Sequence, residues 1–63
     1  MGKSLIGKKE IKAYTRRSWQ TILAWIEVEN FPARKIGGIW ESNQDLVDEW
    51  RRNKILSRPR VGG

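Results

Sequence analysis

The chain has 63 residues, neither cysteine nor histidine, and a formal net charge of +6. A single domain of this size buries only about 60% of the surface that its unfolded chain exposes, so its stability should be modest. The missing residue types exclude disulfides, the usual soft-metal sites, cysteine nucleophiles and histidine bases. We therefore expect no cofactor, and a core that depends on the four tryptophans, each able to bury about 150–250 Å².

The charges are unevenly distributed along the chain. Residues 1–40 carry eight basic and three acidic side chains, residues 41–50 carry four acids, and residues 51–63 carry five bases. Such segregation leaves a positive surface that suits a polyanion. An anionic membrane is a competing partner, but no stretch approaches the ~20 apolar residues of a bilayer span, and no signal-peptide pattern is present. We expect a cytoplasmic protein without a membrane partner.

A first short helix is predicted from Lys8 to Thr15, capped at Gly7, because Ile11 and Tyr14 recur at helical spacing. The apolar period is then broken by three residues in succession, Arg16, Arg17 and Ser18. A serine at this point can accept a hydrogen bond from a free amide of the next turn. The sequence therefore predicts a second helix that starts near Trp19 and ends before Phe31-Pro32, since proline disfavours the helical region for the preceding residue.

The second helix separates apolar from polar side chains on its helical wheel. Its core side should hold Trp19, Ile22, Trp25 and Ile26, and its other side Gln20, Thr21, Ala24 and Glu27. A small, polar helix start fits a major groove about 12 Å wide, where Gln and Thr can each contribute roughly 1–3 kcal/mol of base discrimination. We expect Gln20 and Thr21 to read bases; a plain solvated helix face is the alternative.

A hairpin is predicted around Gly37-Gly38, flanked by the strand-like runs 33–36 and 39–41. Two glycines permit the positive backbone angles of a two-residue turn. The glycines would let the backbone approach phosphate or a minor groove, with charge from Arg34 and Lys35. An ordinary surface hairpin is the alternative.

A third helix is predicted after Ser42, which together with Asp45 resembles a capping box. Its apolar stripe comprises Leu46, Val47 and Trp50, and it should end near residue 53 or 54. We expect a domain over residues 1–56 and a flexible basic tail over residues 57–63. Arg58 and Arg60 in this tail could lie in an A·T-rich minor groove; a solvated tail is the alternative.

These segments resemble the MerR-like or excisionase-like winged helix-turn-helix, a family that also includes the heads of phage terminase small subunits. The similarity covers about residues 5 to 52 and rests on four runs: Ile6-Gly7-Lys8-Lys9-Glu10-Ile11, Ser18-Trp19-Gln20-Thr21-Ile22 with Trp25, Phe31 to Gly38, and Leu46-Val47-Asp48-Glu49-Trp50. The resemblance implies a second helix in the major groove and a hairpin wing on the backbone or minor groove. By position, it assigns DNA contacts to Arg16, Arg17, Ser18, Gln20, Thr21, Ala24 and the wing residues Arg34, Lys35, Gly37 and Gly38.

Trp19 and Trp40 depart from this pattern, because smaller residues are more usual at the head of the second helix and in the returning wing strand. Both can simply enlarge the core. An exposed Trp19 could instead contact a sugar or a thymine methyl.

The expected fold is mainly α with a small two-stranded hairpin wing and about three helices. We expect a double-stranded DNA-binding protein that is not an enzyme, because the carboxylates Asp45, Asp48 and Glu49 share one helix without convergent partners. An excisionase-like factor or a transcriptional regulator of a phage or mobile element fits best. The alternatives are a terminase small-subunit head and a basic protein-interaction module. Cooperative self-association on DNA and a recombinase or terminase partner are compatible with this role.

Overall fold

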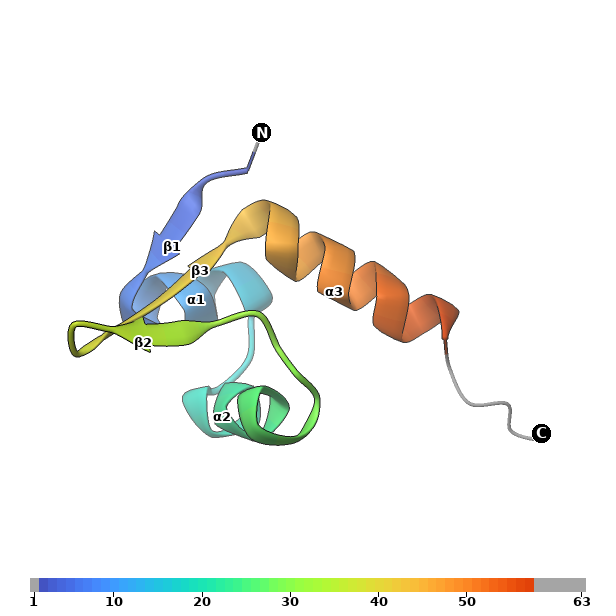
Figure 1. Ribbon diagram of the computed structural model, residues 1–63, viewed down its shortest axis with the longest axis horizontal. Helices are drawn as coiled ribbons and strands as arrows, with labels where there is room; N and C mark the ends of the chain where they lie inside the picture. The colour runs from blue at the N-terminus through green and yellow to red at the C-terminus, as the bar shows by residue number, and fades with distance from the viewer. Residues whose placement is uncertain (1, 58–63) are drawn as a thin grey trace.

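The computed structural model describes residues 2–57, and within them three helices pack on a three-stranded antiparallel sheet (Figure 1). The elements are β1 (Ser4–Ile6), α1 (Gly7–Thr15), α2 (Trp19–Val28), β2 (Arg34–Ile36), β3 (Ile39–Asn43) and α3 (Gln44–Leu56). The predicted layout, mainly helical with a small β-hairpin, is confirmed.

The sheet has a third strand that the sequence analysis did not predict. Its order is β1-β3-β2, with Leu5 opposite Ser42 and Lys35 opposite Trp40. β1 has three residues, too few to show a strand period, and it forms through pairing with a segment far along the chain. The N–H of Gln44 extends this pairing by donating to the carbonyl of Lys3 at 2.9 Å. The hairpin is therefore part of an open three-stranded sheet and not an isolated ribbon.

The buried core takes one apolar side chain from each of β1, α1, α2 and α3 and one from the segment after α2. Its buried members are Leu5, Ile11, Ile22, Phe31 and Val47, and all four tryptophans pack against them while remaining partly exposed. The predicted apolar side of α2 is confirmed in this arrangement. The prediction for Leu46 was wrong: its side chain is 51% exposed, because the inward side of the first turn of α3 is already occupied by Val47.

The helix ends differ from the predicted ones in several places. α1 begins at Gly7, with Ile6 and not Gly7 as its cap residue. α2 ends at Val28, where the left-handed Asn30 (φ 61°) turns the chain so that Phe31 reaches the core. The cap of α3 is Asn43, whose side chain accepts from two backbone N–H groups, and that helix continues to Leu56.

Ser42 was the predicted cap of α3 and has a different role. Its hydroxyl donates to the carbonyl of Pro32 at 2.5 Å, tying β3 to the segment that enters β2. Within residues 2–57, no helix combines the length and the hydropathy that a bilayer crossing requires.

Candidate nucleic-acid interface

The turn between α1 and α2 is tight and exposed. Arg16 adopts the left-handed conformation (φ 61°), and its N–H closes α1 by donating to the carbonyl of Lys12 at 2.7 Å. Ser18 then caps α2 as predicted, accepting from the N–H of Thr21 at 3.3 Å. Two residues therefore separate the helix α1 from the cap of α2, which fixes the angle between the two helices.

The outward face of α2 is polar and uncovered at its start. Gln20, Ala24 and Glu27 are exposed, while Thr21 is half-buried. The Thr21 hydroxyl lies 3.0 Å from the Ser18 hydroxyl, so it is shared with the cap. Gln20 is thus the free polar side chain of the first turn, and the carboxylate of Glu27 makes the later part of this face unfavourable for phosphate.

An aromatic contact joins the first turn of α2 to the hairpin. The rings of Trp19 and Trp40 meet edge to face with their centroids 5.4 Å apart. The ammonium of Lys8 lies 5.6 Å from the centroid of the Trp19 ring, a cation–π distance. The core interpretation of Trp19 is supported over the exposed one, although the ring is only partly buried.

The hairpin turns at Gly37 (φ 60°) and Gly38 (φ 85°), as the sequence predicted. Paired residues of antiparallel strands point to the same side of a sheet. Lys35 is opposite Trp40 and so shares the α2 side, whereas Arg34 is opposite Glu41 on the other side. The two predicted wing cations therefore face different surfaces, and Arg34 has an acidic neighbour.

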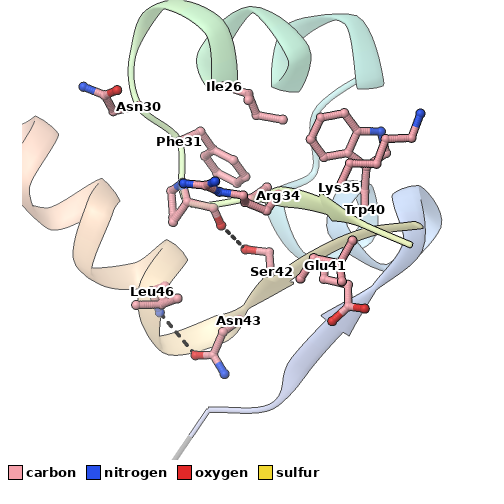
Figure 2. A pocket seen from close by; sticks show the side chains of 13 residues that line it. Ile26, Asn30, Phe31, Arg34, Lys35, Trp40, Glu41, Ser42, Asn43 and Leu46 are labelled. Carbon is pink, nitrogen blue, oxygen red and sulfur yellow. Dashed lines mark hydrogen bonds between the residues drawn. The ribbon is translucent and has the colours of Figure 1, made fainter. Parts of the chain in front are cut away.

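A hollow of about 750 Å³ separates α2 and its exit from the hairpin (Figure 2). Apolar groups from Ile26, Phe31 and Leu46 form part of its lining, and Arg34 and Lys35 also line it. The dashed contacts in Figure 2 show how Ser42 and Asn43 hold its lower edge. No local sequence pattern indicates this hollow, because its walls come from α2, both hairpin strands and α3.

A second hollow of about 430 Å³ lies between α2 and α3. Its lining includes Trp25 and Trp50, whose ring centroids are 5.1 Å apart, and the Arg17 guanidinium lies 6.0 Å from the Trp25 centroid. Arg17 therefore rests against the α3 side of the turn. Of the two arginines predicted to contact DNA from this turn, Arg16 has no such aromatic partner among the contacts of the described residues.

The acidic residues of α3 lie away from the hairpin tip, and two of them accept hydrogen bonds within the protein. Asp48 accepts a hydrogen bond of 2.7 Å from the Tyr14 hydroxyl, which raises the pKa of that phenol. Asp45 accepts from the N–H of Gly2. Because α3 runs away from the hairpin tip in Figure 1, these carboxylates do not crowd the tip.

Residues 2–57 bring together no group of three His, Cys, Asp or Glu side chains that could hold a metal ion. Arg58 and Arg60, the predicted minor-groove residues of the tail, lie outside the described residues. Comparisons with protein-family models, with curated proteins and with solved structures found no match.

Proposed function

We propose that this protein binds double-stranded DNA, with the first turn of α2 in the major groove and the β2–β3 hairpin against the backbone or minor groove. The resemblance described above suggests an excisionase-like factor or a transcriptional regulator of a phage or mobile element, acting in the cytoplasm. The alternatives are the head of a terminase small subunit and a basic protein-interaction module.

One observation carries this proposal: the Trp19–Trp40 contact holds the exposed start of α2 beside the hairpin. Gln20 stands free on that turn, Arg16 precedes it, and Lys35 lies on the hairpin side that faces it. The amino end of α2 adds the positive end of a helix dipole, which favours phosphate. Polar reading groups, cations and a protruding ribbon are thus available to one duplex.

The salt dependence of binding tests the electrostatic part. With about six phosphates neutralised, the C-terminal arginines included, a plot of log K against log salt should have a slope near −5 for duplex DNA. Lys35→Ala should make the slope shallower by about one and weaken all sequences alike. Lys54→Ala is the matched control, because Lys54 pairs with Glu29 at 2.5 Å on the α2–α3 side.

The reading role of α2 needs a separate test. A site selected from a random duplex pool should bind Gln20→Ala more weakly, and the preference over random DNA should fall by about 1–3 kcal/mol. Affinity for random DNA should hardly change. A salt slope near zero would refute the electrostatic part of the proposal. Weak affinity for random duplex DNA at low salt that disappears near physiological salt would favour the interaction module. Equal losses on all DNAs for Gln20→Ala would refute the reading role alone.

A further inference from the structure

The tip of the hairpin is apolar as well as narrow. Ile36 and Ile39 are 57% and 50% exposed and are directly opposite each other across the two strands. They flank Gly37 and Gly38, so the tip reads Ile-Gly-Gly-Ile without a polar side chain. Neither isoleucine belongs to the buried core or packs against it.

The space around the tip is open. A Cβ atom placed on either glycine would meet nothing within 4 Å, and both glycines adopt positive φ angles that L side chains rarely take. Paired strands are about 4.8 Å apart, and the minor groove of B-DNA is about 6 Å wide. A turn without side chains therefore presents the narrowest possible ribbon end to that groove, and the two isoleucines directly behind it require the groove to open.

The tip is also within reach of a neighbouring groove. Gly37 is three residues from Trp40, which corresponds to at most about 10 Å of extended chain. Trp40 in turn contacts Trp19 at the start of α2. Major and minor grooves alternate every half turn of the duplex, about 17 Å. The tip-to-Trp40 span, the 5.4 Å ring separation and the width of α2, about 10–12 Å, together cover that distance, so α2 and the tip can occupy consecutive grooves.

We propose that Ile36 and Ile39 form an apolar wedge that enters the minor groove beside the α2 site and bends the duplex there. This inference rests on the proposed function. Proteins that insert isoleucine or similar side chains at base steps unstack them and kink DNA by about 20–90°. Pyrimidine–purine steps unstack most easily, so the wedge selects a TA or CA/TG step at a position that makes no base-specific hydrogen bond. By strand register Ile36 and Ile39 share the sheet side of Arg34, which supplies charge for the flanking phosphates, while Lys35 faces the α2 side.

The test compares the bend, not the affinity. A duplex of about 30 base pairs containing a selected site and fluorescent dyes at its ends reports the end-to-end distance by energy transfer. The double variant Ile36→Thr/Ile39→Thr keeps β-branched strand residues but removes apolar surface. Val28→Thr is the matched control, since Val28 is 73% exposed at the end of α2, away from the hairpin.

The wild type and Val28→Thr should shorten the end-to-end distance equally, and the double variant should lose at least half of that shortening at saturating protein. A 2-aminopurine next to the central step should brighten at least twofold with the wild type and not with the double variant. Far-UV circular dichroism checks that each variant folds.

The possible failures are distinguishable. The wedge is overturned if the wild type binds the duplex but leaves it straight. It is also overturned if the double variant bends the duplex as much as the wild type does. Either result leaves the proposal of DNA binding intact. An unchanged bend with a loss of self-association assigns the isoleucines to a second copy of the chain and also overturns the wedge. No binding of any duplex by the wild type, even at low salt, overturns both proposals.

Discussion

The contact between Trp19 and Trp40 should be measurable as a coupling energy between α2 and the hairpin. We consider Trp19→Leu, Trp40→Leu and the double variant. Each single change removes part of a half-buried ring and should lower the free energy of unfolding by about 1–2 kcal/mol, less than the cost of truncating a fully buried tryptophan.

The edge-to-face geometry sets the size of the non-additive part. Aromatic pairs with centroids 4.5–7 Å apart contribute about 0.5–1.5 kcal/mol beyond their buried area, and the 5.4 Å separation falls within that range. The double variant should therefore be destabilised by less than the sum of the two single changes, by about 1 kcal/mol. In a domain of this length, 1 kcal/mol corresponds to a shift in Tm of about 4–8 °C.

Urea unfolding followed by far-UV circular dichroism gives the four free energies without relying on the fluorescence of the altered rings. A second cycle between Trp19 and Trp50 is the control, because Trp50 packs against Trp25 and Phe31 instead. That control cycle should be additive within about 0.3–0.5 kcal/mol. If the Trp19 and Trp40 changes were also additive within about 0.3–0.5 kcal/mol, the two rings would not hold α2 against the hairpin.

Other changes test the core, the cap of α3 and one titrating group. Ile22→Ala, at a fully buried position, should cost about 2–5 kcal/mol and unfold much of the protein, whereas Leu46→Ala should cost less than about 1 kcal/mol in the same urea titration; similar costs would contradict the burial pattern. Asn43→Ala removes the acceptor for two N–H groups of α3 and should cost about 0.5–2 kcal/mol, with Asn43→Asp retaining most of the stability. The pKa of Tyr14, the single tyrosine, is raised by its bond to Asp48, so tyrosinate absorbance at 295 nm should titrate above pH 10, and Asp48→Ala should move the midpoint back towards 10. Because the folded pKa exceeds the unfolded one, the stability linked to this bond is present below pH 10 and is lost as the pH rises through the folded pKa; an unshifted midpoint in the wild type would contradict the contact.

Features that depend on a few neighbouring residues could be predicted from the sequence: a helix cap, a hairpin turn and the buried side of a helix. Ser18 combines a break in the apolar period with a capping side chain, and the structure places the cap of α2 there. Gly37 and Gly38 permit one kind of tight turn, and the hairpin forms at that point. Ile22 lies on the apolar side of its wheel and is fully buried.

The first strand and the choice of cap for α3 depend on tertiary contacts and could not be predicted from local sequence. β1 is a strand because its three residues pair with β3, from Ser4 opposite Asn43 to Ile6 opposite Glu41. No local pattern in these three residues indicates a strand. Ser42 and Asn43 are both good capping residues; Asn43 is the cap, since the hydroxyl of Ser42 is engaged by Pro32.

The candidate interface was predictable in its segments but not in its orientation. The sequence placed Arg34 and Lys35 together on a wing, and strand register then put them on opposite sides of the sheet. It also treated Arg16 and Arg17 as equivalent, whereas Arg17 lies over an aromatic ring. Register and ring contacts depend on which elements meet, and composition does not contain that information.

The central position of β3 limits how far this protein can be shortened. A fragment starting at Gly7 would keep α1, α2 and the hairpin but would lose the strand that covers one edge of β3. A bare row of backbone N–H and C=O groups would then face solvent, which is a template for adding strands from other chains. The opposite edge, β2, is protected differently, by being three residues long and carrying two cations. We therefore expect a fragment that starts at Gly7 to aggregate more readily than the full chain.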